Sequence, residues 1–202
     1  MALHIVDPPI GAYEAVRSVV TRMASTSAFR TPALRRTNPA ALALSTPHRV
    51  ATVPLDRIRD AGDLRSIVET TGWRFLLHDG ERVVASIDAV IGTEGTYRFG
   101  HLTEGPFATG TEEAIRRAEA LEVVRKHDFE PSLLLVPALY VVALWLRDRE
   151  GSADLTMPIP PVPVELQAYE AIGAREFLTI LRRLAERMPR QDEKGKSSPL
   201  GG

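Results

Sequence analysis

The chain has 202 residues, of which 44% are hydrophobic and 25% are charged, and it contains no cysteine. This length and composition are typical of one globular domain, and the lack of cysteine excludes disulfide bonds, thiolate metal sites and cysteine nucleophiles. The formal net charge is −1. Most nucleic-acid binders have an excess of basic residues, so we do not expect a nucleic-acid partner.

The first residues predict an extended start followed by a helix. Asp7 precedes Pro8 and Pro9, an order that suits a helix start because Asp can cap free N–H groups and proline has no donor to leave unpaired. Apolar side chains then recur at helical spacing through residues 8–25. Residues 1–9 contain no apolar run of signal-peptide length, so we expect a cytoplasmic location.

Residues 25–47 predict a linker or a loop draped over the surface, because Ser, Thr, Ala, Arg and Pro dominate them. Their basic cluster consists of Arg30, Arg35 and Arg36. A solvated loop is the simplest interpretation. The alternative is a binding site for an acidic partner, since residues 1–66 hold nine Arg against five Asp or Glu.

From His48 the pattern turns to strands, with a short helical stretch predicted near residues 61–71. Three alternating segments then predict an antiparallel meander. These segments are residues 73–78, 81–91 and 96–102. The dipeptide Asp79-Gly80 favours a tight turn between the first two, because both residues tolerate positive φ.

Thr109 and Glu112 stand at capping-box spacing and predict a helix over about 111–127. The apolar run Leu133–Leu146 would span only about 21 Å as a helix, against about 30 Å of membrane hydrocarbon. We therefore expect no membrane span and interpret the run as a strand buried on both faces. Residues 154–160 predict its hairpin partner, with prolines typical of an edge strand or of the exit from a strand.

A last amphipathic helix is predicted over 174–188, and the polar segment after it is predicted to be disordered. The fold class expected is therefore α+β, with a mainly antiparallel sheet (a meander plus a hairpin) covered by about three to four helices. The expected division is an N-terminal helix and linker (1–47), a main α+β domain (48–188) and a tail (189–202).

Catalytic candidates are few. The five histidines form no recognised metal-ligand motif, and the sequence lacks a phosphate loop, a dinucleotide fingerprint and a serine-nucleophile elbow. No metal and no cofactor are therefore expected. The best constellation is Asp88, His101 and Glu104, because a strand register that placed Asp88 across from His101 would let the carboxylate orient the imidazole for acid–base chemistry or a metal. The alternative is the exposed polar face of a half-buried sheet.

The leading functional hypothesis is a cytoplasmic binding or assembly-component protein without catalytic activity, with a protein partner that contacts Arg30, Arg35 and Arg36. A homo-oligomer is left open. The alternative hypothesis is a small enzyme or small-molecule binder that uses Asp88, His101 and Glu104. A pocket that gathers these residues would favour the alternative.

Overall fold

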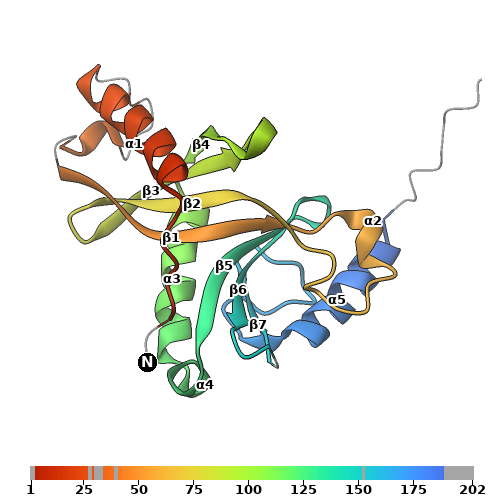
Figure 1. Cartoon of the computed structure of the whole chain (residues 1–202). Coiled ribbons are helices and arrows are strands. Elements are labelled where there is room, and N and C mark those ends of the chain that lie inside the picture. The colour runs from red at the N-terminus through yellow and green to blue at the C-terminus, as the bar shows by residue number, and fades with distance from the viewer. Residues whose placement is uncertain (1–2, 27–28, 30–33, 39–40, 152, 189–202) are drawn as a thin grey trace, which may run out of the picture.

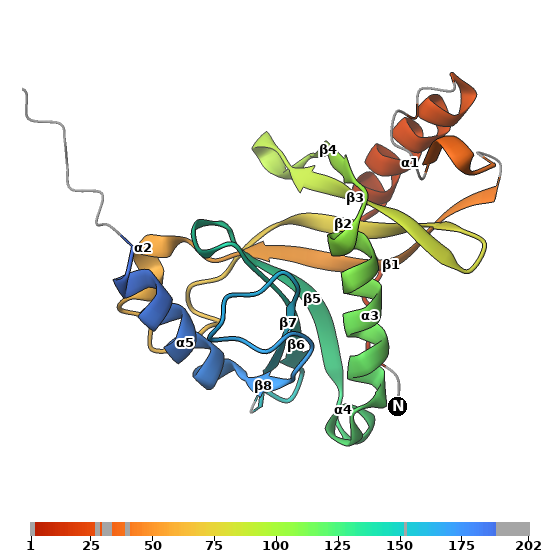
Figure 2. The same ribbon diagram turned by 180° about the vertical axis from the view of Figure 1, so that it is seen from behind.

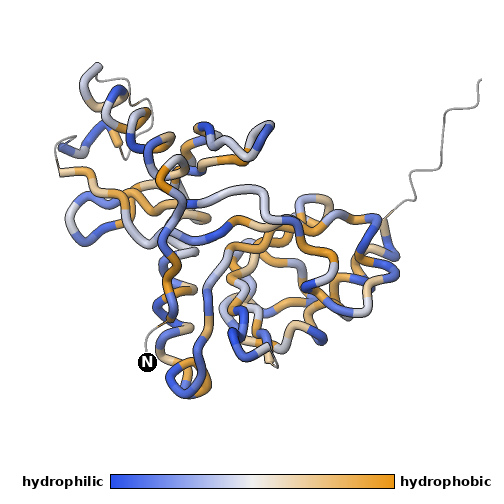
Figure 3. The backbone as a smooth tube through the Cα atoms, in the orientation of Figure 1, coloured by the Kyte–Doolittle hydropathy of each residue, from blue (hydrophilic) through white to orange (hydrophobic). Residues whose placement is uncertain are grey.

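The computed structural model describes residues 3–26, 29, 34–38, 41–151 and 153–188. The predicted tail at 189–202 lies outside these residues, and so does Arg30. The described part has the predicted α+β class, with one mixed sheet and helices on both of its faces (Figures 1 and 2). Figure 3 shows hydrophobic stretches along the strands, and many of the buried core residues belong to these strands.

The described residues contain five α-helices, more than the three to four expected. They are α1 (Ile10–Ser25), α2 (Leu55–Ile58), α3 (Pro106–Ala120), α4 (Glu122–Lys126) and α5 (Ala174–Glu186). The additional helices α2 and α4 are about one turn long, so their apolar residues show no repeat that a sequence pattern could detect. No helix in the described ranges is long and apolar enough to cross a membrane.

Eight strands form the sheet, in the order β4-β3-β2-β1-β5-β6-β7-β8. They are β1 (Leu42–Thr52), β2 (Glu69–Asp79), β3 (Arg82–Ile91), β4 (Tyr97–Thr103), β5 (Phe129–Val136), β6 (Val141–Asp148), β7 (Leu155–Ile159) and β8 (Ile172–Gly173). The predicted meander is confirmed as β2-β3-β4. The expectation of only a meander plus a hairpin was wrong, because β1 and β5 join both units side by side as a parallel pair.

The junction between the two halves of the sheet is short. β1 pairs with β2 along its whole length, but with β5 only through Arg49–Thr52. The N-terminal segment, residues 3–9, bridges the region where β1 and β5 separate: Leu3 packs in the core cluster of α3, Val6 in that of α1, and the backbone N–H of His4 donates to the carbonyl of Phe129 at 2.8 Å. The junction strand β1 also crosses the predicted domain boundary at residue 48.

The helices divide between the two faces of the sheet. Trp73 packs with α1 and lies opposite Arg49, while Ala51, on the same face of β1 as Arg49, packs with α5. The helices α1 and α5 therefore cover one face. The helix α3 covers the other, where Leu133 and Leu144 contribute to its core cluster (Figure 2).

The apolar run Leu133–Leu146 is a hairpin, and its interpretation as a single strand was wrong. The chain leaves β5, turns through a 3-10 segment at Pro137–Leu139 and returns as β6. Tyr140 completes the turn with a φ of 54° and an 85% exposed side chain. Pro137, which has no N–H to donate to the ladder, begins this turn. The hydropathy stays high across the turn because both strands are covered on both faces.

The helix predicted near 61–71 is absent. Helix α2 occupies Leu55–Ile58 instead, directly after Pro54, whose fixed φ suits the residue before a helix start. Leu64 and Ile67 point into the core from turns. Their spacing of three residues therefore reflects burial, not a helix.

The helix predicted over 111–127 begins five residues earlier and is interrupted at Leu121. Pro106 lies in its first turn, where a missing N–H costs nothing. Gly105 precedes it with a φ of 93°, a conformation that favours glycine. The predicted capping box is not used, because Thr109 lies inside the helix and its hydroxyl bonds to the carbonyl of Gly105.

Candidate functional site

A buried ion pair lies at the centre of the β1-β4 half of the sheet. Arg74 on β2 faces Asp88 on β3 in the cross-strand register. The Arg74 guanidinium donates through Nε to Asp88 Oδ1 at 2.7 Å and through Nη2 to Oδ2 at 2.8 Å. Each side chain is only 6% exposed. Such a bidentate pair fixes both groups, because planar guanidinium and carboxylate match in geometry.

His101 reaches this pair through a β-bulge. Ile87 pairs with Leu102 and Ala89 with Phe99, so Gly100 and His101 both lie opposite Asp88. The extra residue turns His101 to the Asp88 face while Leu102 stays in the α1 cluster. His101 Nε2 lies 3.2 Å from Asp88 Oδ2, and the His101 side chain is 59% exposed. The strand register therefore places His101 beside Asp88, which is the condition that the sequence left open.

A second bulge brings His48 to the same row. Ser45 pairs with Leu76 and His48 with Arg74, so two residues of β1 lie opposite Phe75. The His48 ring donates through Nδ1 to the carbonyl of Thr46 at 2.8 Å, since a carbonyl can only accept. His48 Nε2 is then a buried acceptor, and it has no hydrogen-bond partner among the described residues.

His48 is neutral at physiological pH. Burial lowers the pKa of its imidazole to about 4. The bond to Thr46 and the charge of Asp88 act in the opposite direction, while the nearby Arg74 guanidinium adds to the lowering. The four side chains His48, Arg74, Asp88 and His101 form a row across β1, β2, β3 and β4, which we call the polar row.

Glu104 forms a hydrogen bond to a different part of the chain. Its Oε1 accepts the backbone N–H of Leu34 at 3.1 Å, so this carboxylate fastens the segment after α1 to the end of β4. Among the described residues no group of three or more His, Asp or Glu is placed to hold a metal ion. The structure thus brings together Asp88 and His101 but gives Glu104 another partner.

The predicted arginine cluster is described in part. Arg35 and Arg36 lie in a 3-10 turn, η1 (Leu34–Arg36), and both are exposed, while Leu34 is buried against the α1 cluster. An exposed pair of arginines on an anchored turn can contact an acidic group. Their role as a contact surface stays a prediction.

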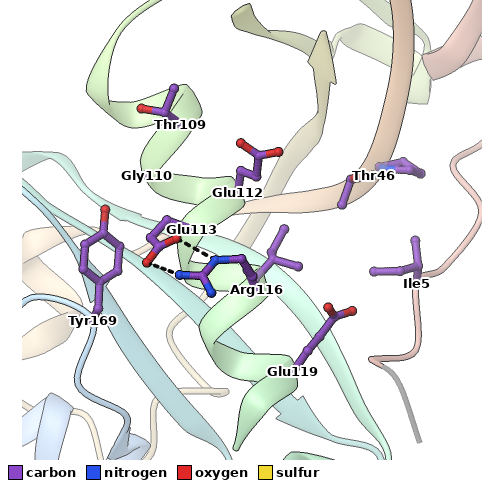
Figure 4. A pocket seen from close by; sticks show the side chains of 11 residues that line it. Ile5, Thr46, Thr109, Gly110, Glu112, Glu113, Arg116, Glu119 and Tyr169 are labelled. Carbon is purple, nitrogen blue, oxygen red and sulfur yellow. Dashed lines mark hydrogen bonds and ion pairs between the residues drawn. The ribbon is translucent and has the colours of Figure 1, made fainter. Parts of the chain in front are cut away.

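A groove of about 940 Å³ runs along α3 and is lined from four segments of the chain (Figure 4). We call it the α3 groove. Tyr169 lies on one side of the helix, and Ile5 and Thr46 lie on the other. Glu112 and Glu119 project from α3 toward the Ile5 side. None of Asp88, His101 and Glu104 lines this groove.

The glutamates along the groove differ in whether an arginine pairs with them. Glu113 is held by Arg117 and Arg116, which lower the pKa of its carboxyl group. Arg117 also lies 4.7 Å from the centre of the Tyr169 ring. Within the part of the chain that the structure describes, Glu112 and Glu119 make no ion pair. They are seven residues apart, about 10 Å along the helix axis. Of the three glutamates that line the groove, these two have no arginine of the described ranges at ion-pair distance.

The pKa of the Tyr169 hydroxyl is raised by its burial and by the nearby Glu113 charge. Tyr169 has a φ of 61°, and its backbone N–H donates to the carbonyl of Pro158 at 2.8 Å. A Cβ atom at Gly110 would lie 3.3 Å from its hydroxyl and 2.8 Å from Ile159. Tyr169 therefore closes its side of the groove by packing tightly against α3.

Sequence reasoning missed Arg74, His48 and the two groove carboxylates. A signal for Arg74 was present, because a charged residue within the alternating strand 73–78 needs a partner if its face is covered. Glu112 and Glu119 share a helix face, but the sequence could not show that the N-terminal segment lies opposite them. Compared with known proteins, the chain matches no family model, no curated protein and no solved structure.

Proposed function

We propose that this chain is a binding protein, a partner-binding or assembly component, and that its partner presents a basic segment to the α3 groove. The observation that carries the proposal is the pair of carboxylates Glu112 and Glu119, which line an open groove and have no ion-pair partner among the described residues. Arg or Lys side chains of a partner would neutralise both charges. The cytoplasmic location expected from the sequence is part of this proposal.

The shape of the groove supports binding over catalysis. Its walls come from α3, β1, the N-terminal segment and the loop at Tyr169, so it accommodates an extended chain along the helix. The catalytic candidates do not line the groove. In the polar row, the charges of Arg74 and Asp88 are neutralised by each other. A basic partner for this groove differs from the acidic partner expected for Arg35 and Arg36, and the two surfaces can be tested separately.

The double variant Glu112→Gln, Glu119→Gln is expected to bind a basic partner about tenfold more weakly at low ionic strength. Two lost charge contacts of roughly 0.7 kcal/mol each give this factor. The measurement is retention of partner protein from the native cell extract, titrated with salt. Salt should weaken wild-type capture more than capture by the variant.

The matched control is Glu81→Gln, Glu94→Gln, which makes the same change of charge at two exposed residues elsewhere. Both double variants should melt like the wild type, since none of the four carboxylates has an ion pair among the described residues. Equal loss of capture in the two double variants would exclude a specific role of the groove.

A second candidate function is acid–base chemistry at His101, favoured by the bulge that aims this ring at a buried carboxylate. Any turnover of activated esters or phosphoesters by the protein is then expected to fall to background in His101→Ala. The exposed His127 provides the control variant, His127→Ala. Turnover that survives in His101→Ala, or is lost equally in both variants, would contradict this role.

A further inference from the structure

A second hollow adjoins the α3 groove, and we call it the α1 hollow. It measures about 450 Å³ and lies between the start of α1 and β1. Its apolar lining consists of Pro8, Ile10, Tyr13, Leu44, Pro47 and Phe75. Pro47 lines both the hollow and the groove, so the two meet at this residue of β1, although α1 and α3 cover opposite faces of the sheet.

Apolar side chains are unusually open to water at this place. Ile10 is 77% exposed, Ile5 39% and Tyr13 38%. They are three of the seven large hydrophobic side chains that are exposed in the described part of the chain, and they lie within nine residues of each other. Tyr13 is held in place by an edge contact with Phe75, with ring centres 6.0 Å apart. A grouped apolar patch beside a groove is typical of a binding surface.

The lining of the hollow, like that of the groove, is net negative. Asp7 and Glu14 line it together with Arg17, and none of the three has an ion pair with another described residue. The apolar surface is thus flanked by a net negative charge, which complements a basic chain and disfavours an acidic one. A basic ligand chain therefore suits both the α3 groove and the α1 hollow.

We propose that the α1 hollow is an apolar subsite for the partner segment that occupies the α3 groove. The ligand is then an extended peptide in which one large apolar side chain, such as leucine, accompanies a pair of lysines or arginines. The apolar side chain contacts Ile10 and Tyr13, and the cations lie along Glu112 and Glu119. This subsite rests on the proposed function of the groove.

The test uses fluorescein-labelled synthetic peptides and the full-length protein. Each peptide carries two lysines and one leucine at a varied separation, with matched versions in which serine replaces leucine or glutamate replaces lysine. Fluorescence anisotropy should show that the best leucine peptide binds about tenfold more tightly than its serine version, a factor that corresponds to about 1.4 kcal/mol. The variant Ile10→Ser should abolish this preference.

Val164→Ser is the control, because Val164 is 95% exposed and lies outside both hollows. It should keep the full preference for leucine. If Ile10→Ser keeps that preference as well, while Glu112→Gln, Glu119→Gln still weakens binding, the subsite is wrong and the groove function stands. If the glutamate peptides bind as tightly as the lysine peptides, or if no peptide binds, the proposed groove function fails and the subsite fails with it.

Discussion

Replacing Asp88 with alanine is expected to lower the free energy of unfolding by about 3–5 kcal/mol, because it leaves a buried guanidinium without its carboxylate. Arg74 gives both of its recorded hydrogen bonds to Asp88, and water does not reach either side chain freely at 6% exposure. Urea unfolding followed by circular dichroism near neutral pH measures the change.

Two further variants separate the unpaired charge from other effects. The double variant Arg74→Met, Asp88→Leu removes both charges and should recover most of the loss, since an apolar pair of similar volume often replaces a buried ion pair without cost. Asp79→Ala breaks a more exposed pair with Arg82, whose atoms are 3.7 Å apart, and should cost less than about 1 kcal/mol. An Asp88→Ala variant as stable as Asp79→Ala would refute this account of the ion pair.

Acid is expected to destabilise the protein through His48 as the pH falls from 6.5 to 5. The folded state holds the pKa of His48 at about 4, below its ordinary value of 6.5. The unfolded chain therefore binds a proton as the pH falls below 6.5, while the folded chain does not. Stability from this group is complete above pH 6.5 and decreases by about 2 kcal/mol on going to pH 5.

The variant His48→Asn tests this pH dependence, because its side-chain amide can still donate to the Thr46 carbonyl but does not titrate. Its stability at neutral pH is expected to be lower, since a smaller side chain leaves space in the core. The decisive quantity is the difference in unfolding free energy between pH 7.5 and pH 5, which should shrink by about 2 kcal/mol. An unchanged difference would show that His48 is not the group responsible.

Local patterns in the sequence were sufficient where one segment determines its own structure. The helix predicted over 8–25 is present as α1 (Ile10–Ser25), and the Asp79-Gly80 turn joins β2 to β3 with Gly80 at a φ of 62°. Helical periodicity and positive-φ residues act over a few residues, so they can be detected without the rest of the chain. The class of fold followed from these elements.

The candidate sites could be predicted only in part, for a physical reason. Asp88 and His101 were singled out because their residue types suit a site, but their contact depends on a bulge that a strand pattern does not reveal. His48 joined them through a second bulge, and Arg74 through the register of β2 with β3. The register between two strands is set by which face of the sheet is buried, and the sequence of one strand alone does not identify its register with a neighbour.

By itself the sequence determined the α+β class, the absence of cysteine chemistry and the main helices, because composition and short-range periodicity fix these properties. Only the tertiary structure decided that Leu133–Leu146 is a hairpin, that β1 pairs with β5 in parallel, and that the N-terminal segment lies beside α3. These features depend on contacts between residues far apart in the chain. Such contacts form when apolar faces from distant segments are buried together. The pattern of one segment does not identify the segment against which it packs.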